Sequence, residues 1–161
     1  MQGETQDGEP LRGTPFILMP FHKFIIYNLF GIYRKGTKIK KYHEALIFIP
    51  RKNVKTSFSA ALAYAVGLLY RKSGSKIYVV AAALKQTLET FNFLKYNVRN
   101  MGESDEDGGL FHIIDNNNEH SIKAEMSDGM FELNALATNP DAQDSFNCNF
   151  AIADEVHAFK K

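Results

Sequence analysis

The sequence has little of the chemistry that marks a secreted protein. It holds one cysteine, Cys148, in 161 residues, whereas a secreted domain of this size usually carries paired cysteines. Its first seven residues are polar and acidic, unlike a secretory signal, which starts basic and continues apolar. We therefore expect an intracellular protein, placed in the cytoplasm, in which Cys148 is a small buried side chain rather than a nucleophile.

Long apolar runs are also missing. The longest, such as residues 60–69, fall short of the roughly 20 residues that cross a bilayer, so we expect no membrane span. With 161 residues, of which 45% are hydrophobic, the chain can build one domain with a substantial core but not two. Residues 1–14 are polar without apolar periodicity, so we expect a disordered leader before a domain over residues 15–161.

The net charge of +1 hides a strong asymmetry along the chain. Residues 1–100 hold 16 Lys or Arg against 5 Asp or Glu, and residues 101–161 hold 3 against 13, so the two parts carry +11 and −10. A basic first part suits a polyanion such as a nucleotide or DNA. The asymmetry is explained equally well if these charged side chains lie on solvent-exposed faces and their opposite charges compensate each other in the folded protein. The basic linker 34–41 is interpreted as a solvated turn, with DNA contact by Lys38, Lys40 and Lys41 as the alternative.

Glycine is absent where a phosphate-binding loop normally needs it. Lys55 is followed by two hydroxyl side chains after an apolar run, as at the end of the loop G-x-x-x-x-G-K-[ST], in which the lysine contacts phosphates and the hydroxyl contacts magnesium. Ile49 and Val54 occupy the two glycine positions. A β-branched side chain at Val54 costs about 1 to 3 kcal/mol if the loop needs a positive φ there. The stretch alone is weak evidence for nucleotide binding.

The apolar periodicity predicts an α/β fold. Helical spacing indicates helices from Pro20 to about residue 31 and over residues 56–70 and 85–100. Continuous apolar runs indicate buried parallel strands at 45–49, which should be central, and at 76–82. Short segments at 110–115, 121–125 and 130–133, separated by turn-forming residues, indicate an antiparallel elaboration or sheet edge. A last apolar run, 149–153, ends in Asp154 and Glu155.

The acidic pair changes the interpretation of the loop. In phosphate-loop NTPases, a buried strand beside the loop strand delivers an acidic residue to magnesium, and a following glutamate can polarise the attacking water. An Asp-Glu pair after an apolar run is common by chance. Its combination with Lys-Thr after an earlier strand, with βα units between, is considerably less common.

The chain resembles the ATPase domain of the large terminase subunit of tailed bacteriophages, the DNA-packaging motor. Residues 19–31, 49–57 and 150–159 carry the resemblance, and the last two are specific. The family's loop has the form P-R-K-N-G-K-[ST], so the missing first glycine is a family trait. The resemblance implies a P-loop NTPase fold of the RecA-like class, with a mainly parallel sheet flanked by helices, and it implies ATP and Mg²⁺ as cofactors.

Site residues follow from the resemblance by position. It implies that the nucleotide is bound by the loop and by one residue of the first helix, namely Arg51, Lys52, Asn53, Val54, Lys55, Thr56, Ser57 and His22. Lys55 contacts the outer phosphates, Arg51 lies near the γ-phosphate, and Glu155 is the base that orients water. Thr56 and Asp154 hold Mg²⁺.

Two departures from the family pattern affect the nucleotide site. His22 stands where the family has a glutamine that contacts adenine, and one neutral ring nitrogen can donate or accept but not both. The alternative is that His22 is an ordinary polar residue of the first helix. Val54 replaces the glycine before Lys55, and we expect it to weaken nucleotide binding without abolishing it.

The resemblance also implies partners: double-stranded DNA, the portal protein, the small terminase subunit and further copies in a ring. The chain stops six residues after Glu155, so we expect a partial ATPase domain, incomplete at its C-terminus and without the family's nuclease domain, in a bacterial host cell. Two alternatives stay open. The first is a helicase-like ATPase, because Asp154-Glu155-Val156-His157 also fits the D-E-x-H box of those enzymes. The second is a degenerate nucleotide-binding or structural fragment without turnover.

Overall fold

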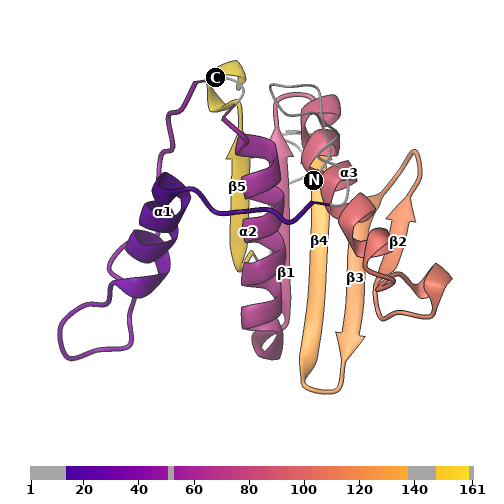
Figure 1. The fold of residues 1–161 in the computed structure, drawn as a ribbon, viewed down its shortest axis with the longest axis horizontal. Coiled ribbons are helices and arrows are strands. Elements are labelled where there is room, and N and C mark those ends of the chain that lie inside the picture. Colours follow the sequence, from indigo (N-terminus) through magenta and orange to yellow (C-terminus); the bar gives the residue numbers. More distant parts are fainter. Residues whose placement is uncertain (1–13, 51–52, 138–147, 160–161) are drawn as a thin grey trace. The chain divides into compact units, whose positions relative to one another are not determined.

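The computed structural model describes residues 14–50, 53–137 and 148–159. The chain forms two compact units, residues 1–58 and 59–161. Helix α1 (Pro20–Gly31) and the first turn of helix α2 (Lys55–Tyr70) belong to the first unit, and the second unit contains a five-stranded sheet (Figure 1). The mixed α/β class predicted from the sequence is confirmed. The predicted leader, residues 1–14, lies almost wholly outside the described residues.

Helix α1 begins at Pro20, as predicted. Proline suits this first position because its missing N–H needs no intrahelical partner there. The apolar spacing does not indicate which side chain is buried, since Phe24 is 69% exposed and the buried residue of the helix is His22. The histidine is buried because its ring stacks on Phe58, with the ring centroids 4.3 Å apart.

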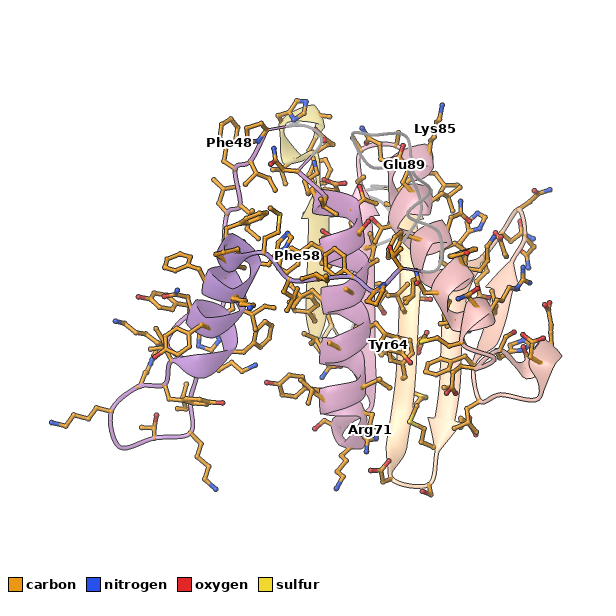
Figure 2. The ribbon with its side chains drawn as sticks, viewed as in Figure 1. Phe48, Phe58, Tyr64, Arg71, Lys85 and Glu89 are labelled. Carbon is orange, nitrogen blue, oxygen red and sulfur yellow. The ribbon has the colours of Figure 1, made fainter. Side chains whose placement is uncertain are left out.

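Residues 45–49 do not form the central strand that their apolar run predicts. The segment has no strand assignment, and Leu46 and Phe48 are 84% and 97% exposed. Figure 2 shows the Phe48 side chain projecting from this segment. A strand needs a neighbour to pair with its N–H and C=O groups, and no described residue pairs with this segment. The first of the two predicted parallel strands therefore does not form.

The sheet lies in the second unit and has the order β2-β3-β4-β1-β5. Its strands are β1 (Ser75–Ala81), β2 (His112–Asp115), β3 (His120–Met126), β4 (Gly129–Ala137) and β5 (Phe150–Asp154). Strands β4, β1 and β5 are parallel, whereas β2 and β3 are antiparallel to their neighbours. The predicted antiparallel elaboration and the predicted last strand are confirmed.

Helices α2 and α3 (Leu84–Asn100) pack on the same face of the sheet (Figure 1). Their small and apolar side chains form one core with alternate residues of the strands, which include Ile77 and Val79 of β1 and Phe131, Leu133 and Ala135 of β4. The helix predicted at 85–100 is therefore confirmed, with Phe91, Leu94 and Val98 buried.

Gly67 lets α2 approach the sheet closely. A Cβ atom at this position would lie 2.3 Å from Cε2 of Phe131 and 2.5 Å from Cδ1 of Ile77. Tyr64, one turn earlier on the same helix and labelled in Figure 2, lies against Phe131, with the ring centroids 5.9 Å apart and an interplanar angle of 63°. The absence of a side chain at Gly67 therefore lets α2 pack closely on the sheet beside Tyr64.

Cys148 is exposed, so the expectation that it is a buried side chain is wrong. It lies just before Asn149, whose N–H donates to the Lys76 carbonyl and whose Oδ1 accepts from the Lys76 N–H. These bonds tie the chain to β1 from Asn149 onward and leave Cys148 outside the sheet. Within the described part of the chain, no helix is both long and apolar enough to cross a membrane.

Candidate functional site

The phosphate-loop half of the predicted site belongs to the first unit. Arg51 and Lys52 lie outside the described residues. Asn53 folds its side chain back so that Nδ2 donates to the Pro50 carbonyl at 3.1 Å. This bond joins the two described residues on either side of positions 51 and 52. The loop is therefore shaped by a side chain as well as by its backbone.

Val54 has φ +58°, in the left-handed region that favours glycine. The sequence-based condition for strain, a positive φ at this position, is thus met in the structure. The backbone keeps the conformation that a glycine would adopt, although the residue is β-branched and 38% exposed. The cost is of the order of 1 to 3 kcal/mol.

Helix α2 starts directly at Lys55 and continues through Thr56 and Ser57. The first bond of this turn runs from the Phe58 N–H to the Val54 carbonyl at 3.0 Å. The first turn of a helix has N–H groups without intrahelical acceptors and a partial positive charge. It also contains no acidic residue here. Lysine, two hydroxyls and a helix N-terminus together make a fitting receptor for a phosphate.

His22 lies against this turn. Its ring stacks on Phe58, three residues after Lys55, with an interplanar angle of 18°. Phe21 and Phe16 also contact the ring, with centroids 4.0 and 5.6 Å away. Burial lowers the pKa of His22, because desolvation disfavours the charged imidazolium. The structure thus places His22 against the first turn of α2.

The acidic half of the site belongs to the second unit. Asp154 is the last residue of β5 and is in register with Ala81, the last residue of the parallel strand β1. Both therefore lie at the carboxyl edge of the sheet, where open α/β sheets bind ligands. The Glu155 N–H donates to Oδ1 of Asp154 at 2.9 Å and so fixes the orientation of this carboxylate.

Glu155 also has a left-handed backbone, with φ +50° and ψ +46°. This conformation turns the chain sharply out of β5 into the short helix Val156–Ala158, whose Ala158 N–H donates to the Glu155 carbonyl at 2.8 Å. Strained non-glycine residues gather at functional sites. Val54 and Glu155 are the non-glycine residues with positive φ among the described residues, and both belong to the predicted site.

One contact at this site was missed by the sequence reasoning. Nδ1 of His157 lies 3.3 Å from Oε2 of Glu155, with the histidine 78% exposed and the glutamate 29% exposed. The D-E-x-H spacing could have indicated this contact, because the sharp turn after β5 brings His157, two residues after Glu155, back toward the glutamate. The sequence analysis used His157 only to weigh a helicase-like alternative.

The described residues contain no group of three or more His, Cys, Asp or Glu side chains that could hold a metal. Magnesium at a nucleotide site does not need one, since it binds one or two protein oxygens together with phosphates and water. The Thr56 hydroxyl and the Asp154 carboxylate are hard oxygen donors of the type that Mg²⁺ prefers, so the predicted donor set fits this ion.

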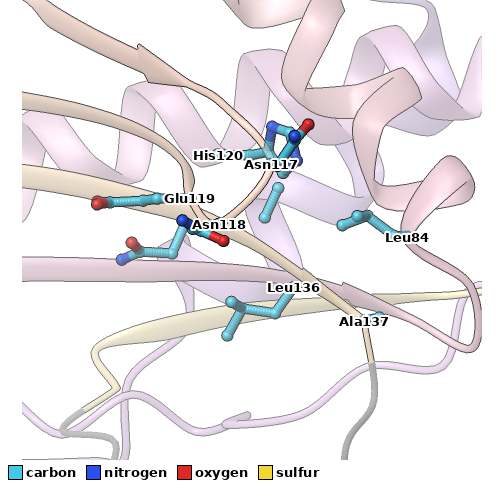
Figure 3. Close-up of a pocket in the computed structure, with 9 residues that line it drawn as sticks. Leu84, Asn117, Asn118, Glu119, His120, Leu136 and Ala137 are labelled. Carbon is cyan, nitrogen blue, oxygen red and sulfur yellow. The ribbon is translucent and has the colours of Figure 1, made fainter.

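A separate pocket of about 200 Å³ lies at the carboxyl end of β4 (Figure 3). Its lining combines apolar residues, among them Leu84 and Leu136, with polar residues of the β2–β3 turn, among them Asn117 and Asn118. None of the described residues predicted to bind nucleotide or metal lines it.

Comparison with known proteins supplies the family. No curated protein and no solved structure matches the chain. The family model described as the terminase large subunit, ATPase domain, matches residues 20–161. This range includes α1, the loop before α2 and the acidic pair after β5, which are the elements that hold the predicted site residues. The chain therefore belongs to the terminase large subunit ATPase domain family.

Proposed function

We propose that this chain is the ATP-hydrolysing motor domain of a phage terminase large subunit, which drives double-stranded DNA into the procapsid. The observation that carries the proposal is the family match over residues 20–161. It favours a packaging ATPase over the helicase-like ATPase that the D-E-x-H box alone allows. The three parallel strands β4, β1 and β5, with an acidic pair at their carboxyl edge, support a P-loop NTPase fold of the RecA-like class for residues 15–161.

Phosphate binding is assigned to the loop and the first turn of α2. Lys55 neutralises the outer phosphates, and the N–H groups at the helix start donate to their oxygens. Asn53, Val54 and Ser57 shape this cradle, and His22 lies where the base binds. Arg51 and Lys52 add positive charge, with Arg51 assigned to the γ-phosphate. Charge neutralisation of this kind is the main catalytic device in phosphoryl transfer.

The metal and the base are assigned to the other half of the site. Thr56 and Asp154 would hold Mg²⁺, which neutralises charge on the phosphate oxygens when it is bound. Glu155 is assigned as the general base that orients the attacking water. Its left-handed backbone directs the chain away from β5, and Nδ1 of His157 lies 3.3 Å from Oε2. A base that is positioned before the nucleotide arrives needs less ordering during the reaction.

The remaining partners follow from the family: the portal protein, the small terminase subunit and further copies of the chain in a ring, in the cytoplasm of a bacterial host. A second candidate is a nucleotide-binding domain without turnover. The β-branched side chain of Val54 favours this candidate, because it adds bulk to the loop at the position where the family has a glycine.

Magnesium-dependent ATP hydrolysis by the chain tests the proposal. Lys55→Ala should abolish turnover and weaken ATP binding, whereas Glu155→Gln should abolish turnover and leave ATP binding within a few-fold. Lys35→Ala and Glu125→Gln, at exposed positions outside the site, are the matched controls and should change neither quantity. Turnover that survives Lys55→Ala would refute the assignment of the loop. ATP binding without turnover in the unmutated chain would favour the second candidate.

A further inference from the structure

His22 carries a buried nitrogen that no described group satisfies. The residue is fully buried, and its Nε2 atom has no hydrogen-bond partner. A polar atom left in this state costs about 1 to 3 kcal/mol, so buried polar atoms in proteins are nearly always paired. An unpaired buried nitrogen beside a candidate ligand site indicates that its hydrogen-bond partner is an atom of the ligand.

The hydrogen bond at the other ring nitrogen determines what Nε2 offers. The Met19 N–H donates to Nδ1 of His22 at 3.1 Å, so Nδ1 must carry a lone pair. In a neutral imidazole the proton then resides on Nε2, which is a donor and not an acceptor. This tautomer is assigned from the hydrogen bond. His22 therefore presents one N–H and no acceptor.

The surroundings of this donor suit a planar ring. Phe58 stacks on the imidazole, and Phe16 and Phe21 flank it at an angle. Phe58 lies in the first turn of α2, directly after the residues assigned to phosphate binding. Because His22 is fully buried, a base reaches Nε2 only if one of these rings moves, and Phe16 belongs to the segment before α1, which forms neither helix nor strand. A base at His22 would thus lie within an aromatic wall beside the phosphate cradle.

We propose that the Nε2–H of His22 donates to the N7 acceptor of a purine, and that this lone donor lets the chain bind GTP about as well as ATP. The inference depends on the proposed function, because it assigns the base of the same nucleotide. Adenine presents N7 as acceptor beside an N6 amino donor, whereas guanine presents N7 beside the O6 acceptor. A side-chain amide can pair with both adenine groups, but a single donor reads only N7, which the two purines share. Cytosine presents an amino donor on the corresponding edge and should bind least well.

Binding of ATP, GTP and CTP with magnesium, measured by calorimetry on the full chain, tests the inference. The unmutated chain should bind ATP and GTP within about threefold of each other and CTP at least about tenfold more weakly. His22→Gln supplies both a donor and an acceptor, so the preference for ATP over GTP should rise about tenfold or more. Lys23→Gln, at the exposed neighbouring position, should leave all three affinities unchanged.

Nitrogen NMR of the His22 ring gives a readout that does not depend on the variant folding. The free chain should show the proton on Nε2, and ATP and GTP should each shift the Nε2 resonance. A proton on Nδ1, or binding of ATP at least tenfold tighter than GTP by the unmutated chain, would overturn the inference and leave the proposed function standing. Failure to bind any of the three nucleotides would overturn both.

Discussion

Replacement of Val54 by glycine is predicted to stabilise the free protein. The residue has φ +58°, where the Cβ of an L-residue crowds the following carbonyl at a cost of about 1 to 2 kcal/mol, and a β-branched side chain falls toward the upper part of the 1 to 3 kcal/mol range. Because the side chain is 38% exposed, its removal loses little burial. Glycine removes the strain altogether.

The net gain is the relieved strain less the extra backbone freedom of glycine in the unfolded chain, which costs roughly 0.5 to 1 kcal/mol. We therefore expect the free energy of unfolding to rise by about 1 to 2 kcal/mol. For a chain of 161 residues each kcal/mol corresponds to an increase in Tm of about 2 to 4 °C. Because the loop already has the strained φ of Val54 without nucleotide, the strain lowers the free energy of unfolding more than it lowers the affinity for nucleotide.

Val54→Ala is the matched control, because alanine keeps the Cβ atom that causes the crowding. Urea unfolding followed by circular dichroism measures all three proteins. The Val54→Gly variant should be the most stable, with Val54→Ala below it. With an ordinary backbone at this position, glycine would instead be less stable than alanine by roughly 0.5 to 1 kcal/mol. That reversed order would refute the left-handed conformation on which the reasoning depends.

Three further predictions concern the rest of the chain. Gly67→Ala should lower the free energy of unfolding by about 1 to 3 kcal/mol, because the new methyl group would overlap Phe131, and thermal unfolding measures the loss. Phe48→Ser should change it by less than about 0.5 kcal/mol, because the ring is 97% exposed; a loss of several kcal/mol in urea unfolding would show that the segment is buried. Asp115→Asn should lower stability at neutral pH by about 1 kcal/mol or less, since the pair is partly exposed, and the difference should vanish in acid.

The pH dependence at Asp115 has a definite sign. Its hydrogen bond from Lys95, and a second with His120, lower the pKa of this carboxyl below its usual value of 3.8. A group whose pKa is lower in the folded state contributes stability above its unfolded pKa and loses it as pH falls through the folded pKa. The unfolding free energies of the two proteins should therefore differ at neutral pH, and the difference should shrink as the pH falls below 3.8 and vanish below the folded pKa. A difference that grows in acid would contradict the assigned ion pair.

Helices and local strands were predictable from the sequence because their signals are local. The first turn of α1 follows from Pro20, and α3 follows from the spacing of Phe91, Leu94 and Val98. The acidic pair was placed correctly at a strand end, since an apolar run stops abruptly before Asp154. These features depend on residues close together in the chain.

Features that depend on distant partners were not predictable. The run 45–49 has the composition of a buried strand, but whether it pairs depends on a neighbouring strand that its own sequence does not contain. The burial of His22 depends on Phe58, and its tautomer depends on the Met19 N–H. The positive φ of Glu155 arises where a strand meets a turn, and nothing in the residue type indicates it.

The central claim is that Lys55 and Asp154 act on one magnesium-bound nucleotide. A double-mutant cycle in Mg-ATP affinity tests it most directly, with the unmutated chain, Lys55→Ala, Asp154→Asn and the double variant measured by calorimetry. Each single change should weaken binding by about tenfold or more, and the double variant should lose little beyond the worse single one, because both groups hold the same phosphate and metal unit. Losses that simply add, or a single variant that binds like the unmutated chain, would contradict the claim.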